Sequence, residues 1–85
     1  MIRGQIEAAI AALNGLVVPE DSRRLTAVIV MLEEVLPEFN DIGRKPWRAV
    51  PWLDCASHLL QVMSAPGTNG AREHVSAARE LLVRE

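Results

Sequence analysis

Three side chains have the types and spacing that could do chemistry: Asp54, Cys55 and His58. On a helix, Cys55 and His58 would be one turn apart, and Asp54 would be an i,i+4 neighbour of His58. A cysteine beside a histidine can act as a nucleophile with its base, and the pair can bind zinc if His74 adds a ligand. In the simpler interpretation, Cys55 is a small apolar side chain and His58 is solvated near Asp54. We favour the simpler interpretation and expect no catalytic residue, no metal and no cofactor.

These side chains can meet only if the chain folds into elements that hold them, and its periodicity predicts four helices. Prolines and glycines fall between segments in which apolar residues recur with the helical period. The expected helices span about 2–14, 19–36, 51–64 and 69–84, with an irregular connection over 37–50. A β-branched run over 26–30 could form a strand, but the longer periodic window favours a helix. We predict a single all-α domain over 1–85, a compact antiparallel up-and-down bundle of four short amphipathic helices.

The third expected helix contains one of the two tryptophans. Pro51 suits the first position of a helix, because the N–H that proline lacks has no acceptor there. A helix that begins at Pro51 places Trp52 on the same apolar side as Ala56 and Leu59. We therefore expect Trp52 to be a core residue.

A basic stretch precedes that helix and holds the other tryptophan. Arg44, Lys45 and Arg48 surround Trp47, which either caps the end of the bundle or anchors a partner. The sequence leaves both options open. The same residues could bind a phosphate and stack on a base, so a nucleic-acid-binding regulator is the first alternative function. The net charge of −2 and the mixed charges of the last helix argue against nucleic acid as the partner.

The second expected helix has more apolar residues than one buried face requires. Every residue over 27–32 is apolar, so Ala27, Val30 and Met31 fall outside the stripe expected to face the core. Such a helix is either central in its bundle or has a second buried face. In the second case, these three residues form a homodimer or partner surface.

The start of this helix carries a short likeness to a known family. The pair Asp21-Ser22, followed by apolar spacing, resembles the Asp-Ser helix start of acyl carrier proteins, in which the serine carries a phosphopantetheine arm. The chain departs from that pattern at Arg23, where the family has leucine, and it lacks the long loop between the first two helices. The plainer interpretation is a polar first turn of a helix. Because of the resemblance at Asp21-Ser22, a small carrier or enzyme domain is the second alternative function.

Composition restricts the class of protein. With 49% hydrophobic and 24% charged residues, the 85-residue chain is globular rather than disordered. One cysteine cannot form an internal disulfide, and no segment has the roughly 20 apolar residues of a transmembrane helix. The N-terminus lacks the features of a signal peptide. We expect a cytoplasmic protein with no membrane partner, and the Ala-, Arg- and Val-rich composition is compatible with a bacterial or phage origin.

These observations favour a protein that binds rather than one that catalyses. We expect a small intracellular protein–protein interaction protein, such as a regulatory adaptor, an inhibitor or immunity-type protein, or an assembly subunit. Its partner would be another protein or a second copy of the chain, bound stoichiometrically through a few aromatic and arginine anchors. The expected partner-binding residues are Arg44, Lys45, Trp47 and Arg48, and the expected oligomer face is Ala27, Val30 and Met31.

Overall fold

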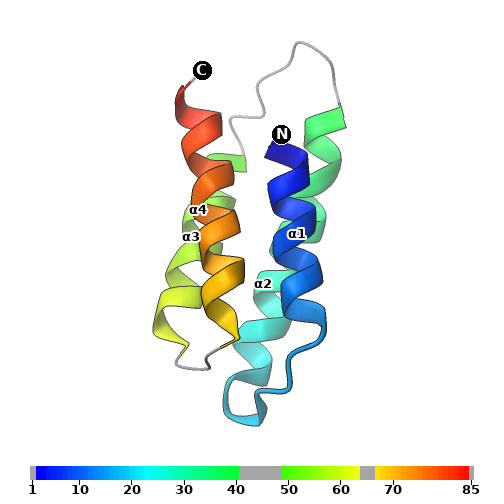
Figure 1. Ribbon diagram of the computed structural model, residues 1–85, viewed down its shortest axis with the longest axis vertical. Helices are drawn as coiled ribbons and strands as arrows, with labels where there is room; N and C mark the ends of the chain where they lie inside the picture. Colours follow the sequence, from blue (N-terminus) through cyan, green and yellow to red (C-terminus); the bar gives the residue numbers. More distant parts are fainter. Residues whose placement is uncertain (1, 41–48, 64–66, 85) are drawn as a thin grey trace.

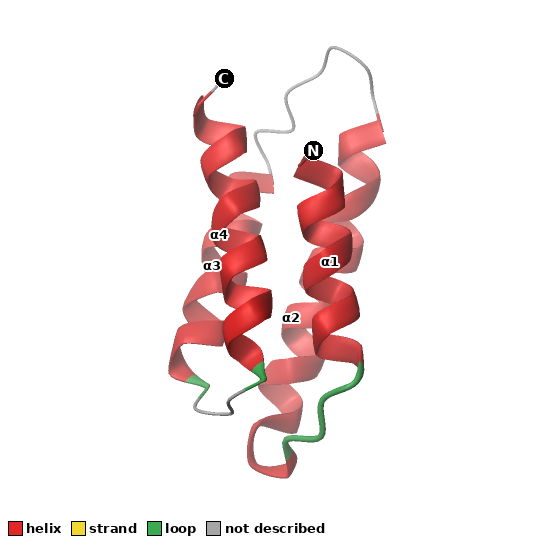
Figure 2. Cartoon of the chain, viewed as in Figure 1, coloured by secondary structure: helices red, strands yellow, loops and turns green. Residues whose placement is uncertain are grey.

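Helices make up the secondary structure of the described part of the chain. The computed structural model describes residues 2–40, 49–63 and 67–84, and within them it contains helices and no strand (Figure 2). The elements in chain order are α1 (Ile2–Asn14), the 3-10 helix η1 (Pro19–Asp21), α2 (Ser22–Val35), the 3-10 helix η2 (Leu36–Asn40), α3 (Ala49–Val62) and α4 (Thr68–Arg84). The predicted all-α fold is confirmed.

The four α-helices run alternately along one long axis. Figure 1 shows α1 and α3 running in one direction and α2 and α4 in the other, so α1 begins and α4 ends at the same end of the bundle. Around the bundle, α1 packs on α2 and α4, and α3 packs on the same two helices. The α1–α4 contact is the most extensive and the α1–α2 contact is the least. The bundle measures 40 × 19 × 18 Å, and its four helices are arranged up and down as predicted.

The element boundaries differ from the prediction mainly around the prolines. The predicted helix 19–36 begins with one 3-10 turn at Pro19, and the predicted irregular connection 37–50 begins with η2. The third helix begins at Ala49 rather than at Pro51. Pro51 is tolerated as the third residue of α3, because the first four N–H groups of a helix have no intrahelical acceptor. Residues 41–48 lie outside the described residues.

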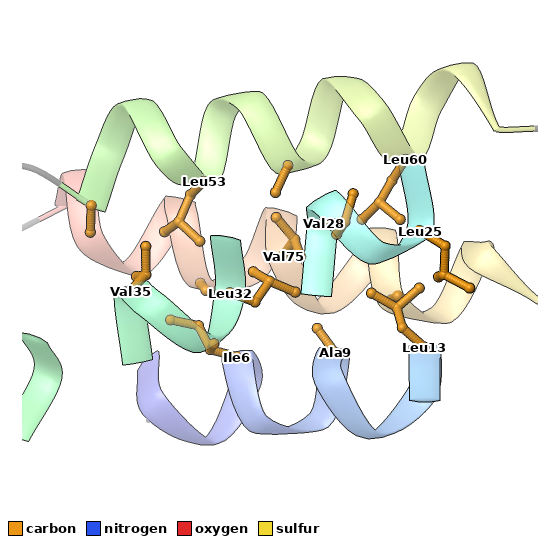
Figure 3. Close-up of a cluster of buried hydrophobic side chains, with 14 of the residues drawn as sticks. Ile6, Ala9, Leu13, Leu25, Val28, Leu32, Val35, Leu53, Leu60 and Val75 are labelled. Carbon is orange, nitrogen blue, oxygen red and sulfur yellow. The ribbon is translucent and has the colours of Figure 1, made fainter. Parts of the chain in front are cut away.

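The core is a column of small and branched apolar side chains that all four α-helices contribute (Figure 3). Its members recur at the spacing of one helical face, so each helix buries a single stripe. In α1, α2 and α4 the buried residues share one face of each helix, as the apolar periodicity of the sequence predicts. The largest fully buried side chains include Ile6, Leu13, Leu32, Leu53, Leu60, Val28, Val35 and Val75.

Trp52 corrects the sequence prediction for the third helix. Its side chain is 41% exposed, whereas the neighbouring Leu53 is fully buried. The buried residues of α3 are Ala49, Leu53, Ala56 and Leu60, which share one face of the helix, and Trp52 lies about 100° away from Leu53. Leucine and alanine fit between closely packed helices, while an indole at the edge can leave its N–H in water. The prediction that Trp52 is a core residue is wrong.

Candidate interaction surface

The outward side of α2 and α3 carries apolar side chains that the core does not use. We call this surface the α2–α3 face and define it by Ala27, Val30 and Met31 of α2 and by Trp52 and Cys55 of α3. Val30 and Trp52 are 46% and 41% exposed, and Cys55 is exposed as well. Ala27 and Met31 are half-buried. These side chains are therefore accessible, at least in part, to a partner.

Two hollows on this face are both lined by Trp52. The first has a volume of about 270 Å³, is almost entirely apolar, and is lined by Met31, Pro51, Trp52 and Cys55. The second has a volume of about 390 Å³ and is lined by Glu34, Val35, Glu38 and Trp52. The indole thus separates an apolar depression from an acidic edge. Such a surface can take up an apolar side chain of a partner while the exposed Glu34 attracts a basic one.

The predicted oligomer residues lie on this face. The structure exposes Val30 and half-buries Ala27 and Met31, so α2 is not enclosed on all sides by the described part of the bundle. The predicted partner-binding residues Arg44, Lys45, Trp47 and Arg48 lie outside the described residues. Whether either group binds a partner stays a prediction.

The possible catalytic or metal-binding residues of α3, Asp54, Cys55 and His58, do not form a joint site. Asp54 forms an ion pair with Arg79 of α4 instead of with His58. His74 is hydrogen-bonded to Gln5 of α1, with 2.7 Å between Nδ1 and Oε1. Cys55 and His58 are both exposed. Among the described residues, no three His, Cys, Asp or Glu side chains are placed to hold a metal ion.

The Asp-Ser pair at the start of α2 is a surface feature. Ser22 is the first residue of α2 and is exposed, and Asp21 accepts a hydrogen bond from Arg24 at 2.8 Å between Nη1 and Oδ1. Only residues 15–18 separate α1 from η1. The serine is accessible, but the long loop of the resembling carrier family is absent here. The carrier alternative stays a prediction.

Sequence reasoning missed the contribution of α3 to this surface. Trp52, Cys55 and Val62 follow one another at intervals of three and seven residues, which places them on one side of a helix. This second apolar side runs beside the buried stripe of α3. Two apolar sides on one helix were the available signal, as on α2. The sequence pattern alone does not say which side faces the core.

Comparisons with known proteins add no assignment to this geometry. No family model, curated protein or solved structure matches the chain. Within the described ranges, the helices are too short or too polar to cross a membrane. Function must therefore be argued from the surface itself, because a helical bundle hosts many unrelated activities.

Proposed function

We propose that this chain is a small intracellular protein that binds another protein stoichiometrically through the α2–α3 face. The observation that carries the proposal is the exposure of Val30 and Trp52 on two adjacent helices. Isolated exposed apolar residues are ordinary, but neighbouring ones around an aromatic side chain are typical of interfaces. The activity would be that of an adaptor, an inhibitor or an assembly subunit, without turnover of a substrate.

The energetics of such binding would centre on Trp52. Aromatic side chains near the centre of an interface are enriched among residues that dominate affinity. The apolar hollow beside the indole offers space for one side chain of the partner, and burial of apolar surface contributes roughly 25 cal/mol per Å². Ordering and translational costs offset part of this gain.

Charge around the face supports a protein partner over nucleic acid. Glu34 and Glu38 line the hollow on one side of Trp52. The exposed carboxylate of Glu34 repels phosphate, on which nucleic-acid binding depends. Basic or neutral side chains of a protein meet no such repulsion.

Photo-crosslinking inside the cell tests the proposal with two matched positions. Val30 on the α2–α3 face and Val83 on α4 have similar exposed fractions, 46% and 48%. A photoreactive phenylalanine analogue at position 30 should give a discrete crosslinked protein, and the same analogue at position 83 should not. Equal crosslinking from both positions, or none from position 30, would contradict the proposed function.

A further inference from the structure

The exposed side of α2 carries an ordered row of charged and apolar residues. We call Arg23, Ala27, Val30 and Glu34 the α2 outer stripe. At about 100° per residue, these four residues fall within about 60° of one line along the helix. That line lies opposite the stripe that α2 buries in the core. Arg23, Val30 and Glu34 are exposed, and Ala27 is half-buried.

The order of residues in the stripe makes it complementary to itself. It runs from a positive residue through two apolar residues to a negative one. A second copy in the antiparallel direction places Arg23 opposite Glu34 and Ala27 opposite Val30, at both ends of a two-fold axis. One register satisfies both pairs, because the spacing from Arg23 to Ala27 equals the spacing from Val30 to Glu34. Parallel alignment would instead oppose like charges.

The two charged ends of the stripe have no competing partner within the described residues. Arg24, the next residue, is paired with Asp21 at 2.8 Å. Arg23 and Glu34 form no ion pair or side-chain hydrogen bond with any side chain that the structure describes. Both are therefore available to a second copy. The small side chain of Ala27 also lets two helices approach closely.

The neighbouring helix extends this surface beyond α2. Trp52 lies next to Glu34, and the apolar hollow beside it reaches Met31. A 14-residue helix is about 21 Å long, so two facing α2 helices with their α3 flanks bury on the order of 1,000 Å². That area is at the low end for a specific interface and corresponds to a weak, reversible dimer.

We infer that the partner on the α2–α3 face is a second copy of this chain, paired antiparallel through the α2 outer stripe. The inference rests on the proposed function, because it names the occupant of the same face. In the dimer, each Arg23 lies against Glu34 of the other copy, close to Trp52 of that other copy. The apolar centre supplies attraction, and the two charge pairs fix the antiparallel register.

Charge exchange tests the register directly. Sedimentation of the wild-type chain from about 1 to 500 μM at about 50 mM salt should show a reversible dimer with a dissociation constant of tens of micromolar. Arg23→Glu and Glu34→Arg should each weaken self-association at least about tenfold, since each opposes like charges twice. An equimolar mixture of the two single variants should dimerise again, because every pair then has opposite signs. The double variant should also recover the wild-type association. Circular dichroism of each variant checks that the bundle is intact.

The outcomes separate this inference from the proposed function. A wild-type chain that stays monomeric throughout the range, or single variants that are not rescued by mixing, would overturn the self-pairing. A position-30 crosslink to a protein of another mass, together with a monomeric chain, would overturn it while leaving the proposed function intact. A crosslink of twice the chain mass that is lost in Arg23→Glu would support both.

Discussion

Two helices of the same bundle, α2 and α4, pack against the core in the same way but differ on their outward sides. Both bury a single apolar stripe. The exposed side of α4 is mostly polar, with Asn69, Glu73, Ser76 and Glu80. The exposed side of α2 has Val30 at its centre, one turn from the half-buried Ala27. Because α4 is held in the bundle without a second apolar side, the fold does not require the one on α2.

The two helices also differ in what their polar groups contact. The polar side chains of α4 reach both neighbours, through His74 to Gln5 of α1 and through Arg79 to Asp54 of α3. The charged ends of the α2 outer stripe have no such partner among the described residues. Polar groups of α4 are therefore used within the bundle, whereas those of α2 point to contacts outside it.

The largest expected effect separates core from surface within α3. Leu53→Ala should lower the free energy of unfolding by about 3 kcal/mol, because it removes a fully buried side chain and leaves a cavity. Trp52→Ala should cost clearly less than Leu53→Ala, because Trp52 is already 41% exposed and its loss leaves no enclosed cavity. Urea unfolding of both variants measures the difference. A larger loss from Trp52→Ala would place the indole in the core and remove it from the α2–α3 face.

Trp52 and Leu53 show where prediction from the sequence alone fails. The helical period located α1, α2 and α4 with their buried stripes, even on α2, where further apolar residues lie outside the stripe. On α3, apolar residues cover two adjoining sides, and Leu53 rather than the neighbouring Trp52 is the one that the bundle buries. The choice depends on the space between the helices, which no local pattern contains. The sequence did predict the α2 residues of the face, because the surplus of apolar residues is visible within that one helix.

The next effect tests the polar contact between α4 and α1. Gln5→Ala should lower the free energy of unfolding by about 1 kcal/mol, because it removes the half-buried hydrogen bond to His74. Ser76→Ala, on the exposed side of α4, the helix that carries His74, is the control and should change stability by less than about 0.5 kcal/mol. Urea unfolding at neutral pH measures both. Equal effects would show that the contact contributes nothing to holding α4.

A smaller effect is expected from the contact between α4 and α3. Asp54→Asn should cost about 0.5 kcal/mol or less at low salt, because both members of the Asp54–Arg79 pair are nearly half exposed. The cost should shrink as salt is raised to about 0.5 M, since screening weakens exposed charge pairs. A thermal-unfolding series over salt concentration measures this. A loss that is large and independent of salt would mean that the pair is more tightly held than its exposure indicates.

The smallest effects on stability are expected at Val30 and Val83, the two positions that should differ most in self-association. Val30→Glu and Val83→Glu should each change the stability of dilute monomer by less than about 0.5 kcal/mol, since both valines are about half exposed and glutamate is a good helix former. If the α2–α3 face self-associates, the wild-type melting temperature should rise with protein concentration by mass action. Val83→Glu should keep that dependence, and Val30→Glu should lose it. Melting temperatures of the three proteins over a hundredfold concentration range measure this, and parallel behaviour of both variants would contradict a special role for the outward side of α2.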